Sequence, residues 1–186
     1  MPTKNVFQLY SSVGQRRLLA NWAHVFERLL PLGGRSSANH VRLLASGDDT
    51  FSLMLDAMSK AETHVWLETY IFEVDAVGIL FRDALVDAAR RGCDVILLYD
   101  HFGSSNLSAD FLLPIIQAGG KAVAFNPIWP WRRQKPFLFR DHRKILIIDQ
   151  LKAFCGSCNI GAMPFRDTVM QVEGPGVTDL ANLFLT

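Results

Sequence analysis

The sequence predicts an α/β fold, an α-β-α sandwich whose central sheet is mixed and largely parallel. Between residues 41 and 126, short runs of β-branched and aromatic residues alternate with amphipathic segments of helical period, as in parallel strands joined by helices. After residue 136, three more strand-like runs follow without a helical segment between them. The 186 residues, 49% of them hydrophobic, suffice for one domain with a substantial core.

The N-terminal residues 1–39 are expected to form an amphipathic helix and a linker. Apolar residues recur every three or four positions from Gln15 to Leu30, and proline and glycine then end the pattern. The first acidic residue is Glu27, so a transit peptide or a surface-seeking helix is the alternative to an ordinary helix. The α/β domain is expected to cover residues 40–186.

The elements of this domain follow in a regular order. Strands are predicted at residues 41–45, 64–72, 93–99, 121–126, 140–148, 152–156 and 168–173. Helices are predicted at 50–61, 77–91, 109–118 and from 177 onward. Asp48 and Asp49 are expected to cap the first of these helices, and Gly92 to end the second. Ligands of such sheets bind beyond the carboxyl ends of the strands.

One stretch combines side chains that can hold and attack a phosphate, with the spacing His142-x-Lys144-x4-Asp149-x6-Gly156-Ser157-x-Asn159. In a strand, His142 and Lys144 share one face. Lysine supplies a point charge for phosphate oxygens, and a neutral imidazole can attack phosphorus to form a covalent intermediate. Ser157 and Asn159 follow the next strand and could donate hydrogen bonds to the same group.

Two carboxylates are expected to have different duties near this stretch. Asp149 falls on the opposite strand face from His142, so a structural role is expected, either pairing with a cation or capping a turn. A nucleophilic histidine needs a partner that fixes its tautomer. Asp167, which enters the following strand, is the best placed candidate for that role.

Charge and cysteine content limit the partners. The net charge is +1, but residues 129–144 hold six basic residues and one acid, enough to attract an anion. Within this run, Trp129, Trp131, Arg132 and Arg133 suit a membrane interface with anionic lipid; a surface loop with locally packed aromatics is the alternative. The three cysteines complete no metal site, and no apolar run is long enough to span a membrane.

The pattern of His142, Lys144 and Asp149 followed by Gly156-Ser-Cys-Asn159 resembles the HKD and GSxN motifs of the phospholipase D superfamily, most closely the bacterial-type cardiolipin synthases. The resemblance extends from about residue 40 to the end. It implies that His142 is a nucleophile forming a phosphohistidine, with Lys144, Ser157 and Asn159 at the phosphate. It further implies a structural Asp149, an Asp167 that orients His142, and neither metal nor cofactor.

The sequence departs from that family in two respects. The family uses two HKD motifs, the second supplying the general acid for the leaving group, and only one occurs here. The second motif is therefore expected from a homodimer partner or from a missing C-terminal half. The run from Asn159 to Arg166 is also shorter than in cardiolipin synthases, so some substrate contacts are expected to be missing, and the position of Asp167 does not follow from the family pattern.

Three hypotheses follow. The first is a phosphatidyl transferase acting on a phosphatidylglycerol-like phospholipid at a membrane surface, peripheral on the cytoplasmic face or in an organelle such as a mitochondrion. The second is a homodimeric single-HKD phosphodiesterase or nuclease; nucleic acid is disfavoured because no stacking platform is visible. The third is a non-catalytic isolated half.

Overall fold

The computed structural model describes residues 36–45, 47–127, 138–162 and 167–186. The chain divides into two compact units, residues 1–36 and 37–186, and almost all described residues belong to the second. The predicted helix between Gln15 and Leu30 lies outside the described residues. Among the residues described, no helix combines the length and apolar character needed to cross a membrane.

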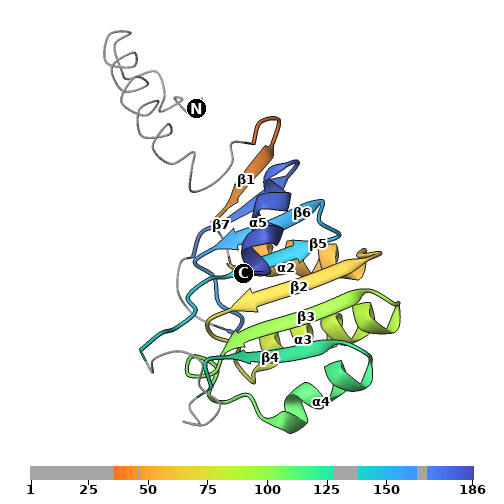
Figure 1. The fold of residues 1–186 in the computed structure, drawn as a ribbon, viewed down its shortest axis with the longest axis vertical. Helices are drawn as coiled ribbons and strands as arrows, with labels where there is room; N and C mark the ends of the chain where they lie inside the picture. The colour runs from red at the N-terminus through yellow and green to blue at the C-terminus, as the bar shows by residue number, and fades with distance from the viewer. Residues whose placement is uncertain (1–35, 46, 128–137, 163–166) are drawn as a thin grey trace. The chain divides into compact units, whose positions relative to one another are not determined.

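The second unit alternates strands and helices in the predicted order and then adds antiparallel strands (Figure 1). The strands are β1 (His40–Leu44), β2 (His64–Thr69), β3 (Asp94–Asp100), β4 (Lys121–Phe125), β5 (Ile145–Ile148), β6 (Lys152–Gly156) and β7 (Val169–Glu173). The helices are α2 (Gly47–Ser59), α3 (Ala76–Arg90), α4 (Ala109–Gln117) and α5 (Gly176–Phe184). Asp49 was expected before this helix as a cap, but α2 begins at Gly47 and Asp49 lies within its first turn. A carboxylate at that position interacts favourably with the helix dipole.

The seven strands form one mixed sheet in the order β1-β7-β6-β5-β2-β3-β4. Parallel pairing is confined to β2–β3 and β3–β4, while the other neighbours pair antiparallel. The α/β class and the mixed sheet are confirmed, but the expectation of a largely parallel sheet is wrong. The reason is that β1 pairs with β7 at one edge, and β5 to β7 form antiparallel hairpins beside β2.

Helices cover both faces of the sheet. On one face, α2, α3 and α4 pack Met58, Phe81 and Ile115 against Leu67 and Leu146 of the central strands. On the other face, a smaller core includes Trp66, Ile147 and Phe184, with α5 as its cover. The Trp66 and Phe184 rings stack with centroids 5.4 Å apart. Figure 1 shows α5 in front of the sheet and α2 and α3 behind it.

Two predicted strands are shorter than expected, and both changes affect the candidate site. The strand predicted at 140–148 is reduced to β5, so residues 140–144 form no ladder. Side chains hold this segment instead, because Asp141 N donates to the Asp100 carboxylate at 3.0 Å. The strand predicted to reach Phe72 ends at Thr69, after which Phe72 keeps only a single bridge to Ile160.

Candidate active site

The candidate residues gather at one edge of the sheet. The strands β2, β3, β4 and β6 end at this edge, and β5 and β7 begin there, as their pairing registers require. The segment before β5 brings His142 and Lys144, the segment after β6 brings Ser157 and Asn159, and Asp167 lies just before β7. Segments distant in the sequence therefore converge beyond the carboxyl ends of β2 and β3, where this class of sheet places its ligands.

His142 and Lys144 share one face although they lie outside a strand. The imidazole of His142 stacks on the ring of Tyr70, with centroids 3.8 Å apart and planes inclined by 25°. The ammonium of Lys144 lies 5.4 Å from the centroid of the same ring, and Lys144 Nζ donates to the His142 carbonyl at 2.8 Å. His142 is exposed and Lys144 half-buried, so an imidazole and a basic side chain lie together at the open end of the strands.

Burial and neighbouring carboxylates have opposite effects on the pKa of Lys144. Burial lowers the pKa of its ammonium, while the carboxylates of Asp141 and Asp167 act to raise it. Burial, together with the negative charge of Asp167, also raises the pKa of the nearby Cys158 thiol to about 11. Cys158 is therefore a neutral thiol near neutral pH. The basic side chain of this pair, which could bind a phosphate, is that of Lys144.

Ser157 and Asp167 are bonded to each other. Ser157 Oγ donates to Asp167 Oδ1 at 2.7 Å and accepts from Thr168 N at 3.1 Å. Within the described ranges, no hydrogen bond joins Asp167 to His142. The structure thus places Asp167 on the serine of the motif, and its orienting role toward His142 stays a prediction.

Asn159 is anchored by one half of its amide. Its Oδ1 accepts from Ile71 N at 3.1 Å, which ties the segment after β6 to the segment after β2. The bond fixes the identity of the two amide atoms, because the oxygen must face Ile71 N. Among the described residues, the amino group has no hydrogen-bond partner, so its two donors are available to a ligand.

Asp149 lies at the opposite end of β5 from the candidate site. Its carboxylate accepts from Thr63 N at 2.7 Å, His64 N at 2.9 Å, Glu62 N at 3.1 Å and the Thr63 hydroxyl at 2.9 Å. Asp149 and Gln150 both have positive φ, as the central residues of a type I′ turn do, and Leu151 N closes the turn by donating to the Ile148 carbonyl at 3.0 Å. Asp149 therefore joins the β5–β6 turn to the start of β2, and contacts none of the candidate phosphate ligands described.

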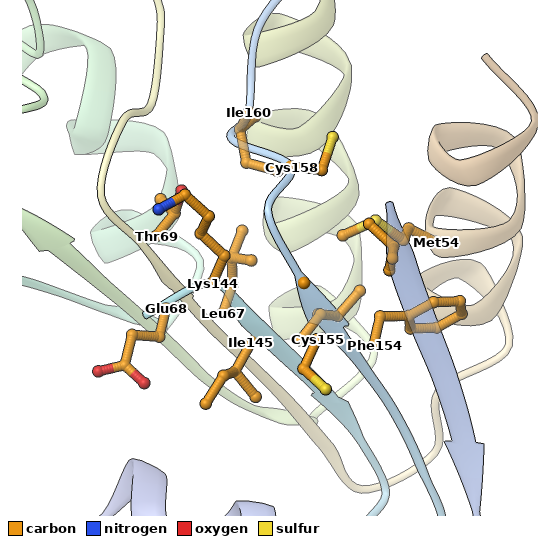
Figure 2. A pocket seen from close by; sticks show the side chains of 13 residues that line it. Met54, Leu67, Glu68, Thr69, Lys144, Ile145, Phe154, Cys155, Cys158 and Ile160 are labelled. Carbon is orange, nitrogen blue, oxygen red and sulfur yellow. The ribbon is translucent and has the colours of Figure 1, made fainter. Parts of the chain in front are cut away.

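A small cavity beneath the edge is lined by Lys144, Thr69 and Cys158 (Figure 2). Its volume is about 10 Å³, room for one water molecule, so it is no substrate pocket. Figure 2 also shows that the side chain of Lys144, just before β5, and that of Glu68, on β2, extend in opposite directions. A larger open hollow of about 570 Å³ lies beside His142 and is lined by Phe125, Phe139, Arg140, Asp141, His142, Arg143 and Thr186.

Sequence reasoning missed a buried polar cluster behind the site. Glu68 and Asp141 are 0% and 6% exposed, and Arg143 contacts both carboxyl groups, with N–O distances of 2.7 and 3.2 Å. Burial, and then the neighbouring Asp141, raise the pKa of Glu68 to about 9. Burial also acts on Asp141, but hydrogen bonds from Glu68 and Arg143 lower its pKa overall. The signal in the sequence was a lone acid, Glu68, within an apolar strand.

Asp100 is the third buried acid of this region and is fully covered. Its Oδ1 accepts from Phe102 N at 2.9 Å and Gly103 N at 3.0 Å, while its Oδ2 accepts from Asp141 N. One carboxylate thus fixes the loop after β3 and the residue before His142 at the same time.

The predicted membrane contacts Trp129, Trp131, Arg132 and Arg133 lie outside the described residues. In the part of the chain that the structure describes, no cluster of three or more histidine, cysteine or acidic side chains could hold a metal ion.

Solved structures with this fold define its class. Nuc from Salmonella typhimurium, a phospholipase D family member, superposes with a TM-score of 0.60 at 19% identity and covers 79% of this chain and 92% of its own. NucT from Helicobacter pylori gives a TM-score of 0.62 at 15% identity, covering 79% of this chain and 94% of its own. The fold is that of the phospholipase D family.

The sequence defines the family more closely. The family described as "Cardiolipin synthase, PLD-like domain" matches residues 54–172, and the chain belongs to it. Cardiolipin synthase 1 of Bacillus anthracis is 36% identical over 173 residues, which are 87% of this chain and 34% of that protein. Cardiolipin synthase A of Pseudomonas fluorescens is 33% identical over 89% of this chain and 37% of its own. The chain thus spans about a third of the length of these relatives.

Proposed function

We propose that this chain provides the nucleophile-bearing half of a phosphatidyl transferase of the cardiolipin synthase type, acting on phosphatidylglycerol or a similar phosphodiester lipid. The observation that carries the proposal is the joint placing of His142 and Lys144 on the ring of Tyr70 at the open edge of the sheet. Membership of the cardiolipin synthase family supports it.

The proposed reaction has two displacements at phosphorus. A ring nitrogen of His142 attacks the phosphodiester, a P–N bond forms, and the P–O bond to the head-group glycerol breaks. Glycerol leaves with a proton from a general acid. The hydroxyl of an acceptor lipid then attacks the phosphohistidine, loses its proton, and releases His142 as the P–N bond breaks. Lys144 and the Asn159 amino group would stabilise the negative charge on the non-bridging oxygens.

The general acid is proposed to come from a second HKD motif. A glycerol alkoxide is a poor leaving group, so its departure needs a proton at the opposite side of phosphorus from His142. A second copy of this chain or a further segment of a longer protein would supply it. Because the chain corresponds to about a third of its relatives, both sources are consistent with the proposal.

Peripheral contact with a membrane is part of the proposal. Leu138 is 88% exposed, and Phe139 and Phe102 are about half exposed, all close in sequence or space to the site. The Arg140 guanidinium lies 5.3 Å from the Phe102 ring centroid, so a cation accompanies this apolar rim. Aromatic and basic side chains together suit the head-group region of an anionic bilayer. The site would then face the leaflet that holds its substrate.

The decisive experiment uses a substrate whose leaving group needs no general acid. A phosphatidyl ester of p-nitrophenol loses a stable phenolate, so attack by His142 can be tested without a second motif. The purified chain should release nitrophenolate and form a phosphatidyl adduct on His142, detected by mass spectrometry. His142→Ala should abolish both, and His40→Ala, on the exposed edge strand β1, should abolish neither. Absence of adduct and release from the wild-type chain would leave only a non-catalytic isolated half.

A homodimeric phosphodiesterase is the second candidate, and one observation favours it. The chain covers 92% and 94% of the Nuc and NucT chains, so proteins of this size exist with a single copy of the fold. Light scattering of the purified protein and turnover of a soluble bis(p-nitrophenyl) phosphate distinguish the candidates. A dimer that turns over the soluble diester as fast as the lipid ester supports the phosphodiesterase, and preference for lipid vesicles supports the transferase.

A further inference from the structure

The contact between Tyr70 and His142 is closer than ordinary surface packing. The two rings lie nearly face to face, with centroids 3.8 Å apart. The Lys144 ammonium lies within the range of a cation–π interaction with the same ring. A single aromatic side chain thus contacts both residues that the proposed reaction needs. Tyr70 follows β2 directly, at the carboxyl end of a central strand.

Tyr70 itself is held on its backbone and on its ring. Its carbonyl accepts from Ser104 Oγ at 3.1 Å, and the same hydroxyl accepts from Phe72 N at 3.0 Å. The loop after β3 closes against the ring at Gly103. A Cβ at Gly103 would collide with the Tyr70 carbonyl oxygen and lie 2.9 Å from ring atoms Cδ2 and Cε2. Glycine is therefore required for the loop to approach this closely.

Asp100 connects the loop that packs on Tyr70 to the segment that carries His142. Through Oδ1 it holds Gly103 N, which lies against the Tyr70 ring, and through Oδ2 it holds Asp141 N, one residue before His142. The stacked pair is thus built from three segments: the Asp100 carboxylate binds the segments after β3 and before β5, and Ser104 Oγ binds the segment after β2 that carries Tyr70. The orientation of the His142 imidazole is therefore set by contacts between these three segments, before any ligand binds.

We infer that Tyr70 is a positioning residue for His142. Stacking blocks one face of the imidazole and limits its rotation, while the ring nitrogens, whose lone pairs lie in the ring plane, stay free at the edge. The attacking atom is then held in place before substrate binds, which lowers the entropic barrier to displacement. The electron-rich face of Tyr70 would also favour positive charge on the imidazole as the P–N bond forms. The catalytic part of this inference rests on the proposed function.

The role requires an aromatic ring and not a hydroxyl, which allows matched variants. Tyr70→Phe keeps the stack, Tyr70→Leu removes it, and Tyr99→Leu makes the same change at a tyrosine of β3 without a described contact to His142. Circular dichroism and thermal unfolding establish which variants fold. If Tyr70→Leu does not fold, Tyr70→Met serves as the second unstacked variant.

The first measurement does not depend on activity. In NMR spectra of histidine-labelled protein, ring current from Tyr70 should move the His142 ring protons upfield, with His142→Ala identifying them. The shift should persist in Tyr70→Phe and Tyr99→Leu and disappear in Tyr70→Leu. An unshifted His142 in the wild-type chain would overturn the inference, whether or not the chain is an enzyme.

The second measurement tests positioning in catalysis with the p-nitrophenyl lipid ester. Tyr70→Leu should lower kcat by about tenfold or more with little change in KM, as expected for loss of pre-orientation. Tyr70→Phe should stay within about twofold of wild type. Equal losses in Tyr70→Phe and Tyr70→Leu, or full kcat in Tyr70→Leu, would overturn the role. A wild-type chain that is inactive but shows the ring-current shift would refute the proposed function and leave the stack established.

Discussion

The guanidinium of Arg143 lies 2.7 Å from a carboxyl oxygen of Glu68, a residue without solvent exposure in the centre of the sheet. The same guanidinium serves Asp141, 3.2 Å away, so two buried carboxyl groups share one cation. A second negative charge there would have neither water nor a partner. Glu68 therefore keeps a proton and Asp141 keeps the charge, in agreement with the opposite directions of their pKa shifts.

This pair predicts a pH dependence of stability. Burial raises the pKa of Glu68 from 4.5 to about 9, so between these values the folded chain binds a proton that the unfolded chain has lost. Its contribution is fully present below pH 4.5 and declines as the pH rises toward 9. The slope from one such group is at most about 1.4 kcal/mol per pH unit.

The change to test is Glu68→Gln, which keeps the shape of the protonated acid and cannot ionise. Denaturant unfolding at pH 5, 6, 7 and 8 should show a flatter decline in the free energy of unfolding than in wild type. Glu62→Gln, an exposed acid, is the control and should keep the wild-type slope. Parallel slopes for wild type and Glu68→Gln would show that Glu68 is ionised in the folded protein.

The second prediction is that Asp149 contributes to the stability of the fold and not to the reaction. Asp149→Ala removes an acceptor of four hydrogen bonds and strains a position with φ of 54°, so the free energy of unfolding should fall by about 2–4 kcal/mol. Asp149→Asn keeps an acceptor and tolerates positive φ, and should cost less. Both variants, assayed below their unfolding temperature, should retain nitrophenolate release. Loss of release in a folded Asp149→Asn chain would place this residue in the reaction.

Much of the fold was predictable because its signals are local. Strand and helix positions between residues 40 and 126 agree with the structure to within a few residues, since each apolar run and each helix end is encoded nearby. The pairing of β1 with β7 was not predictable, because it joins residues more than 120 positions apart. The strand predicted from Arg140 ends up as β5 alone for a related reason: distant side chains, Asp100 and Glu68, bind this segment in place of a ladder.

The candidate site was predictable in part. His142 and Lys144 lie on one side although they are outside a strand, since both contact the ring of Tyr70. The partner of the histidine was harder to foresee. Asp167 was expected there by sequence position, yet the structure places it on Ser157, and an aromatic ring contacts His142. Such contacts arise where loops meet, and their spacing in the sequence carries no information about them.

The third prediction concerns the charge of Lys144. Burial already lowers the pKa of its ammonium, and Asp167 opposes that effect. Asp167→Asn should therefore lower the pKa of Lys144 further, so the protonated form that binds phosphate is lost at a lower pH. The alkaline limb of kcat/KM for the lipid ester should move to lower pH, while Asp179→Asn, on α5, should leave it in place. An unmoved limb would mean that Asp167 does not influence the phosphate-binding cation.

The last prediction tests which half of Asn159 serves the ligand. Asn159→Asp keeps an oxygen for Ile71 N, so the chain should fold with near wild-type stability. The change removes the two amino donors and adds a negative charge where a phosphate would bind, so inhibition by inorganic phosphate should weaken about tenfold or more. Asn159→Ala loses the anchor as well, and should lower both the free energy of unfolding, by about 1 kcal/mol or more, and phosphate binding. Unchanged phosphate inhibition in Asn159→Asp would show that the amide only joins the loops after β2 and β6, and that Lys144 alone binds the anion.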